Sequence, residues 1–144
     1  MRSLPVALTI LSSAALAFAT AAPAAAPNPC KLTTAADVKA VFGASIGRGK
    51  LQSLGLYKSC SYTGAGFAVT IQTRPLSKSD FVKSAKMNPG PVKAVSGLGA
   101  PAYFAGRVTL LVWRHGNEAT FTMFGSGSPL AGEIKLAKRA LPRM

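Results

Sequence analysis

Two cysteines place the strongest constraint on how this chain can fold. Cys30 and Cys60 are its only thiols, so a single intrachain bridge is possible. Such a bond would close a loop of about 30 residues and disfavour the unfolded chain by roughly 3.5–4 kcal/mol through lost conformational entropy. Neither cysteine belongs to a Cys-x-x-Cys motif, so a structural bridge is favoured over a reactive thiol. Whether the bond forms depends on the compartment that the chain reaches.

The N-terminus has the features of a secretory signal peptide. Arg2 precedes an apolar stretch, Leu4–Phe18, which is shorter than the ~20 residues that a membrane-spanning helix needs. Small residues follow and allow cleavage after Ala19 or after Ala21. We therefore predict that residues 1–21 are a signal peptide and that the protein is secreted or periplasmic.

An Ala/Pro-rich linker, residues 22–29, separates this signal from Cys30. The sequence Pro27-Asn28-Pro29 directly before the cysteine does not match the lipid-attachment motif of bacterial lipoproteins. We therefore expect no lipid anchor, and we expect no transmembrane segment in the mature chain. An oxidising compartment then favours a disulfide between Cys30 and Cys60.

Residues 30–144 predict a single α+β domain in which helices pack on an antiparallel sheet. Apolar side chains alternate along 67–71, as in a half-buried strand. The expected helices span 35–42, 78–87 and 129–141, and the expected strands span 58–63, 67–74, 92–95, 103–105, 108–114 and 119–124. The last helix has an apolar stripe made by Leu130, Ile134, Ala137 and Leu141. The glycine-rich stretch 44–56 is expected to be irregular.

Two stretches of the chain resemble a known family. The first is Cys30-Lys31-Leu32-Thr33 before a helix with Asp37-Val38, followed by Cys60-Ser61-Tyr62. The second is Val95-Ser96-Gly97-Leu98-Gly99-Ala100-Pro101-Ala102-Tyr103 and the terminal helix. The pattern covers most of residues 30–141 and is similar to small exported bacterial domains of unknown function, many of them lipoproteins. These look distantly similar to the extracellular sensor domain of a mycobacterial receptor kinase and to Mog1/PsbP-like folds.

This resemblance implies a fold and a compartment. The family carries no known catalytic residues, so it assigns no site to this chain. Ala100 stands where the family's loop more usually has Asp, and the lipid-acceptor cysteine of many members is missing here. The second difference favours a soluble protein.

Residues that build common catalytic and metal sites are scarce. His115 is the only histidine, and it falls in an expected hairpin turn. The acidic residues are Asp37, Asp80, Glu118 and Glu133. Their spacing indicates neither a metal site nor a catalytic carboxylate pair. The segment Gly47-Arg48-Gly49-Lys50 is not a Walker loop, because Ala44 and Leu51 occupy positions that need Gly and Ser or Thr. We therefore predict no catalytic residue, no metal and no cofactor.

The charge balance is strongly basic. Seventeen Lys and Arg against four Asp and Glu give a net charge of +13, and removal of Arg2 with the signal leaves +12. Such a charge attracts polyanions, and the attraction weakens with salt. We expect the partner to be an anionic envelope component or an envelope protein. Nucleic acid is not expected, because most aromatic residues alternate into the predicted core. The residues expected to contact the partner are Arg48, Lys50, Lys78, Lys83 and Lys86.

These observations favour an exported, disulfide-linked, non-enzymatic binding or sensor-like module of the bacterial cell envelope. Its expected working surface is the loop Gly43–Leu51 together with the loop Ser96–Pro101, since loops on a packed scaffold commonly carry recognition. Two alternatives stay open. One is a small secreted hydrolase that uses His115 with a serine, and the other is a passive polyanion-binding envelope protein that needs only its net charge.

Overall fold

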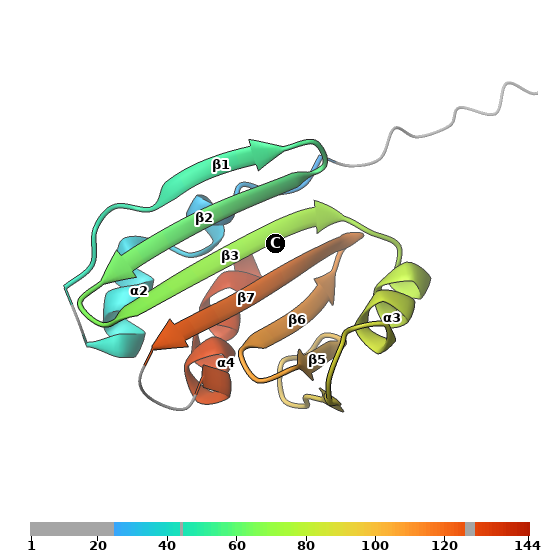
Figure 1. Ribbon diagram of the computed structural model, residues 1–144. Helices are drawn as coiled ribbons and strands as arrows, with labels where there is room; N and C mark the ends of the chain where they lie inside the picture. The colour runs from blue at the N-terminus through green and yellow to red at the C-terminus, as the bar shows by residue number, and fades with distance from the viewer. Residues whose placement is uncertain (1–24, 44, 126–128) are drawn as a thin grey trace, which may run out of the picture.

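The computed structural model describes residues 25–43, 45–125 and 129–144, so the predicted signal peptide lies outside it (Figure 1). Within these ranges one sheet contains the strands β1 (Lys50–Leu54), β2 (Tyr57–Gly64), β3 (Phe67–Pro75), β4 (Val92–Ala94), β5 (Ala102–Ala105), β6 (Thr109–Arg114) and β7 (Asn117–Gly125). The helices are α1 (Pro29–Leu32), α2 (Ala35–Phe42), α3 (Lys78–Lys86), α4 (Pro129–Ala140) and the short 3-10 helix η1 (Leu141–Arg143). None of the helices described is long and apolar enough to cross a membrane. The predicted single α+β domain is confirmed.

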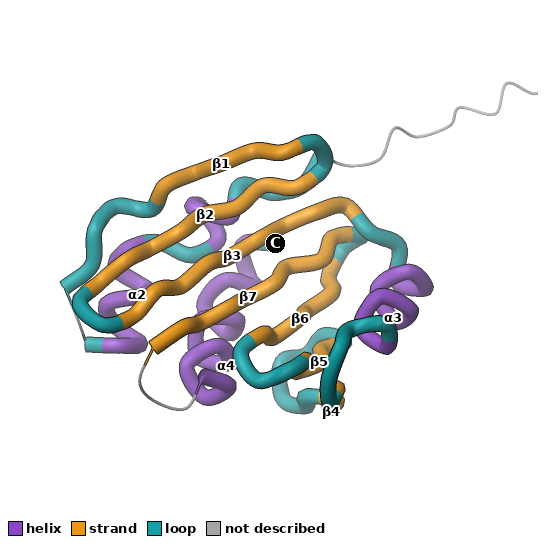
Figure 2. The backbone as a smooth tube through the Cα atoms, viewed as in Figure 1, coloured by secondary structure: helices purple, strands orange, loops and turns teal. Residues whose placement is uncertain are grey.

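The sheet consists of two antiparallel meanders that meet in its centre (Figure 2). Its strand order is β1-β2-β3-β7-β6-β5-β4, and every neighbouring pair is antiparallel. The strands β1 to β3 form the first meander, and β4 to β7 form the second. The two join through the long β3–β7 pairing, in which Ile71 lies opposite Phe121. Helix α3 belongs to the connection that carries the chain from β3 to the far edge of the sheet.

Helices cover the two faces of the sheet to different extents. Helices α1, α2 and α4 lie together on one face (Figure 1), and the main core between them and the sheet includes Ile71, Phe121 and Leu136. Helix α3 packs on the other face at the β5–β6 end, where the rings of Phe81 and Tyr103 lie 5.6 Å apart. Helix α3 also reaches the outer face of β3 and β7 at one end, where Ser84 contacts Arg74 and Glu118; the rest of the outer surface of β1, β2, β3 and β7 has no helix over it among the elements described.

Strand β1 corrects the prediction that residues 44–56 are irregular. Lys50–Leu54 pairs with β2 along its whole length, from Lys50 opposite Ser61 to Leu54 opposite Tyr57. All five of its residues are exposed because β1 is an edge strand, so its sequence lacks the apolar alternation that marks a half-buried strand. Gly55, with φ +58°, begins the two-residue turn of the hairpin. The other predicted elements are confirmed, with bounds that differ by up to two residues.

The start of the domain is tied to the sheet by the predicted disulfide, which is confirmed. Cys30 in α1 is bonded to Cys60 in β2, with a Cα–Cα distance of 5.2 Å. Part of the segment assigned to the linker also packs on the sheet. Ala26 is buried, its carbonyl accepts a hydrogen bond of 2.7 Å from Lys58 Nζ, and the Pro27 carbonyl accepts one of 2.7 Å from Thr73 Oγ1. The packed domain therefore includes residues 26–29.

Asp37 joins the first long helix to the end of the chain. Its carboxylate completes a capping box with Thr34 at the start of α2. The same carboxylate accepts a hydrogen bond of 2.6 Å from Arg143 and lies 3.6 Å from Arg139. Burial alone would raise the pKa of Asp37, but the hydrogen bonds from Arg143 and Thr34 outweigh it and lower the pKa from 3.8 to about 2.

We expect Asp37→Asn to lower the free energy of unfolding at pH 7 by about 2 kcal/mol, because the native state favours the ionised carboxylate by that amount. The wild type should lose the same contribution as the pH falls from about 4 through 2. Urea unfolding at pH 7 measures the first effect, and urea unfolding of the wild type at several pH values between 4 and 2 measures the second. Asp80→Asn is the matched control, because Asp80 occupies the same position of α3 but is exposed. Equal losses in the two variants would contradict the assigned role of Asp37.

Helix α4 packs with a wider face than its predicted stripe. Ala137 and Leu141 are buried as expected, while Leu130 and Ile134 are half-buried at the margin. The buried residues that the stripe did not include are Gly132, Glu133, Leu136 and Ala140. Glu133 is an acidic residue inside the core, and neither of its carboxylate oxygens has a hydrogen-bond partner within the described ranges.

Candidate functional site

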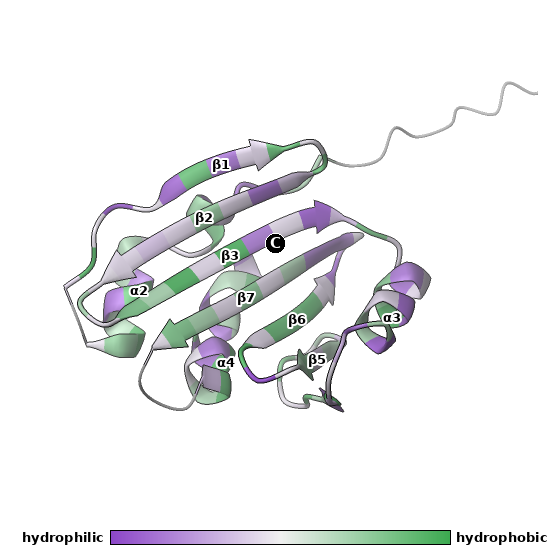
Figure 3. Ribbon diagram, viewed as in Figure 1, coloured by the Kyte–Doolittle hydropathy of each residue, from purple (hydrophilic) through white to green (hydrophobic). Residues whose placement is uncertain are grey.

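The candidate site is built from the side chains that point away from the main core. Along β2, Cys60 and Tyr62 are buried, so Ser59 and Ser61 point to the opposite face of the sheet. In Figure 3, β2 is coloured pale to purple, as expected of polar residues, whereas β6 is green. We call the outer surface of β1, β2, β3 and β7 the open face. Its hydroxyl and amide side chains include Gln52, Ser59, Ser61, Thr63, Thr70, Gln72, Thr120 and Thr122.

One row of hydroxyl groups crosses four strands of the sheet. Ser61 lies opposite Thr70, Thr70 opposite Thr122, and Thr122 opposite Thr109. Ser61 Oγ lies 3.4 Å from Thr70 Oγ1, and Thr109 Oγ1 lies 3.4 Å from Thr122 Oγ1. These contacts are long for hydrogen bonds between hydroxyl groups. The row therefore keeps donor and acceptor capacity for a molecule on the open face.

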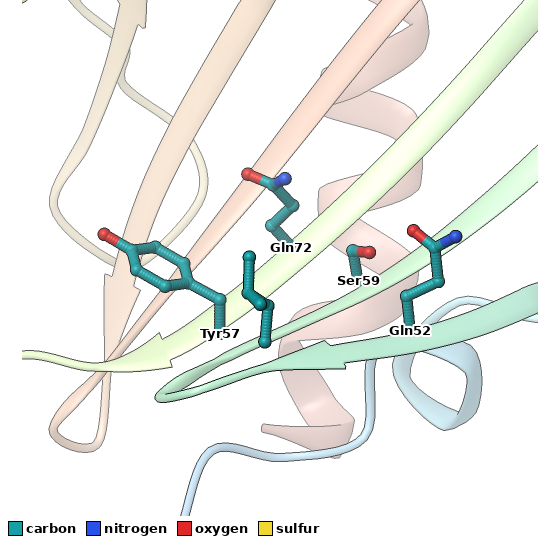
Figure 4. Close-up of a pocket in the computed structure, with 5 residues that line it drawn as sticks. Gln52, Tyr57, Ser59 and Gln72 are labelled. Carbon is teal, nitrogen blue, oxygen red and sulfur yellow. The ribbon is translucent and has the colours of Figure 1, made fainter.

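A hollow of about 270 Å³ lies beside this row, at the β1–β2 edge (Figure 4). Gln52, Ser59 and Gln72 lie in register across β1, β2 and β3. Leu54 and Tyr57, the last pair before the hairpin turn, complete the lining. None of these five side chains carries a formal charge at neutral pH. The hollow thus combines amide and hydroxyl groups with an aromatic ring and a leucine.

Arg74 fixes the position of Tyr57 at the rim of this hollow. Its guanidinium donates to both carboxylate oxygens of Glu118 at 2.9 and 3.1 Å and to Tyr57 Oη at 2.6 Å. Burial alone would lower the pKa of Arg74, but the hydrogen bond to Glu118 outweighs it and raises the pKa above its ordinary value. A bidentate pair of this kind holds both partners in a fixed geometry. Strands β2, β3 and β7 are therefore cross-linked beside the hollow.

The five basic residues expected to bind one partner lie in two separate groups. Arg48 and Lys50 are exposed at the start of β1, and Lys50 shares the open face with Ser61. The second group is exposed on α3, which packs at the β5–β6 end of the sheet, and consists of Lys78, Lys83 and Lys86. The loops 43–51 and 96–101, expected to form one working surface, also lie apart. The first leads into β1 and the second joins β4 to β5, at opposite edges of the sheet, so that expectation is wrong.

His115 lies in the two-residue turn between β6 and β7, where it has a φ of +49° and is exposed. A second hollow, of about 340 Å³, lies between this turn and the 96–101 loop, and its lining includes Trp113 and Pro101. No serine or carboxylate lines this hollow in the described parts of the chain. In the same parts, no group of three or more His, Cys, Asp or Glu is arranged to hold a metal ion. No described contact gives His115 a catalytic partner.

The open face is the functional candidate that sequence reasoning missed. A signal for it exists, because small polar residues alternate in three segments, at Ser59 and Ser61, at Thr70 and Gln72, and at Thr120 and Thr122. The three segments can be recognised as one surface only when β3 and β7 are known to be neighbours, and no local sequence pattern specifies that pairing. The hollow also needs β1, which the sequence analysis treats as irregular.

Comparisons with known proteins add no residue role to this geometry. No family model, no curated protein and no solved structure matches the chain. The interpretation of the site therefore rests on the positions and the chemistry of its own side chains.

Proposed function

We propose that the protein is an exported, non-enzymatic binding module of the bacterial cell envelope and that its open face holds a neutral glycan. The observation that carries this proposal is the hollow beside Tyr57, which places two side-chain amides and a hydroxyl on an uncovered sheet face. The helices on the opposite face and the Cys30–Cys60 bond provide a stable scaffold for such a surface.

The chemistry of the lining favours a sugar over a charged ligand. Gln52 and Gln72 each offer an NH₂ donor and a carbonyl acceptor, and the Ser59 hydroxyl can donate and accept. Neighbouring hydroxyl groups of a sugar also donate and accept, so they complement this set. The Tyr57 ring adds a rigid apolar surface with a polar tip, against which the C–H face of a sugar ring can pack. The adjoining hydroxyl row extends the surface along a chain of several sugars.

Three observations support the location in the envelope. Residues 1–21 have the charge, apolar run and small residues of a signal peptide. A structural disulfide is typical of oxidising compartments. The sequence also resembles small exported bacterial domains around Cys30, Cys60 and the segment Val95–Tyr103.

We expect Gln52→Ala combined with Gln72→Ala to weaken glycan binding about 10- to 100-fold, because two to four hydrogen bonds of roughly 0.5–1.5 kcal/mol are lost. Cosedimentation of the oxidised protein with an insoluble, uncharged envelope polysaccharide measures this effect. Wild-type binding should saturate and should persist at high salt, since hydrogen bonds to a neutral sugar are not screened. The variant should unfold at the wild-type temperature, because both side chains are exposed.

Lys135→Gln combined with Lys138→Gln is the charge control. Both lysines are exposed on α4, which covers the opposite face of the sheet. This variant should bind the polysaccharide as the wild type does. Three results would reject the glycan site in favour of a passive polyanion-binding protein: binding that never saturates, binding that vanishes at high salt, or binding that falls in Lys135→Gln/Lys138→Gln but not in Gln52→Ala/Gln72→Ala.

A further inference from the structure

The turn of the β1–β2 hairpin exposes large apolar side chains, of which Leu54 and Tyr57 also line the hollow and Leu56 does not. Leu54 is 82% exposed, Leu56 is 70% exposed and Tyr57 is 44% exposed. We call these residues, together with Gly55 between them, the hairpin tip. Single exposed apolar residues are ordinary, but a group of them on one protruding turn marks a contact surface.

The hairpin carries positive charge and no negative charge. Residues 45–67 contain three cations, Arg48, Lys50 and Lys58, and no Asp or Glu. The side chain of Lys58, which directly follows the tip, donates to the neutral carbonyl of Ala26, so no carboxylate compensates its charge there. An apolar tip backed by uncompensated cations complements an anionic lipid surface, whose headgroups attract the cations while the acyl region accepts the apolar side chains.

The predicted signal peptide would keep the hairpin tip within reach of the membrane until it is cleaved. The described chain begins at Ala25, and the contact between Ala26 and Lys58 fixes this start beside the tip. The apolar run of the predicted signal ends at Phe18. Seven residues of fully extended chain span about 25 Å. Until cleavage, the described start of the chain would therefore lie no farther than about 25 Å from the end of the apolar run.

We propose that the hairpin tip inserts into the interface of an anionic phospholipid bilayer, with Lys58 at the level of the headgroups, while Lys50 and Arg48, at the far end of β1, attract the anionic surface over a longer range. A second copy of the chain fits this surface less well, because two copies without the signal peptide, each with a net charge of +12, repel one another. The proposal goes beyond glycan binding, since it assigns a second ligand to the turn, which shares Leu54 and Tyr57 with the hollow but adds the exposed Leu56.

Vesicle cosedimentation tests the proposal. The oxidised residues 22–144 are used, because they contain every described contact but not the apolar run, and thermal unfolding first establishes that they fold. The protein should bind vesicles of equal parts phosphatidylglycerol and phosphatidylcholine and should not bind pure phosphatidylcholine. Leu54→Ser combined with Leu56→Ser should reduce the partition coefficient at least tenfold without changing the unfolding temperature. Arg48→Ala combined with Lys50→Ala should reduce binding and its dependence on salt.

Phe124→Ser is the matched control. Phe124 is also an exposed apolar residue, at 56%, but it lies opposite Ala68, at the end of the sheet strands that is remote from the hairpin tip. It should bind vesicles as the wild type does. Unchanged vesicle binding by the double leucine variant would overturn the proposal and leave net charge as the cause. A dimer that forms without vesicles and is lost in the same variant would assign the tip to a second copy instead.

The two proposals fail independently. Leu56 does not line the hollow, so Leu56→Ser alone should weaken vesicle binding and leave polysaccharide binding intact. Gln52→Ala combined with Gln72→Ala should weaken polysaccharide binding and leave vesicle binding intact. Loss of both activities in Leu56→Ser, or in the double glutamine variant, would overturn the separation of the two ligands.

Discussion

Glu133→Gln is expected to raise the free energy of unfolding at pH 9 by several kcal/mol and to remove most of its dependence on pH between 5 and 9. The reason is the burial of an acidic side chain in the core under α4. Desolvation raises the pKa of Glu133 from 4.5 to about 8, and the nearby backbone of Met123, which favours the ionised form, only partly opposes this. A neutral amide of the same shape cannot ionise.

The direction of the pH effect follows from proton binding. Between pH 4.5 and about 8, the folded chain keeps the Glu133 proton while the unfolded chain releases it. The contribution of the protonated carboxyl to the free energy of unfolding is therefore fully present below pH 4.5. It is lost, and wild-type stability declines, as the pH rises through 8. The pKa difference corresponds to a decline on the order of 3–5 kcal/mol. Glu133 thus acts in the opposite direction to Asp37, whose contribution is lost in acid.

Urea unfolding of the wild type and of Glu133→Gln at pH 5, 7 and 9 measures this effect. Asp37→Asn serves as the control, because it should be less stable than the wild type at each pH yet keep the alkaline decline. A wild type whose stability is the same at pH 5 and pH 9 would show that the Glu133 carboxyl reaches water or a partner, and would contradict the prediction.

The second large effect is expected from the disulfide. Cys30→Ala combined with Cys60→Ala should lower the free energy of unfolding by roughly 3.5–4 kcal/mol, because the unfolded chain is released from a 30-residue loop. The bond also holds α1 against β2, and with it the buried Ala26 and Pro29. Urea unfolding of the oxidised wild type and of the double variant gives the difference.

Reduction of the wild type provides an independent control for this prediction. The reduced wild type and the double alanine variant lack the same bond and should unfold at the same urea concentration. If the oxidised protein also unfolds at that concentration, the bond contributes no stability. Where the variant remains folded, it should still bind polysaccharide, because neither cysteine lies on the open face.

The sequence predicts those parts of the fold that depend on local patterns. The helix 35–42 has a capping residue and an apolar side, and β3 alternates regularly, so both are found where expected. Strand β1 is not predicted, because an edge strand without a buried side has no such alternation. The turn at Gly55 was its one local signal, since glycine with positive φ suits a two-residue hairpin turn.

The candidate site was less predictable, for a different physical reason. Ser61, Thr70 and Thr122 come from three segments, and their proximity depends on strand pairings between distant parts of the chain. Glu133 was equally hidden, because a glutamate on an amphipathic helix is normally solvated. Its burial depends on the rotation of α4 about its own axis. The predicted stripe places Leu130 and Ile134 at the centre of the buried face, but in the structure they lie at its margin and Glu133 is buried instead.

The hydroxyl row crosses the seam between the two meanders, because Thr70 belongs to the first and Thr122 to the second. A glycan lying along the row would therefore contact both meanders at once and hold the two halves of the sheet together. Binding would stabilise the folded chain against separation of β3 from β7 by RT ln(1 + L/Kd), where L is the free glycan concentration. Occupancy of the open face would therefore lower the population of chains in which the two meanders have separated, and with it their cleavage by proteases.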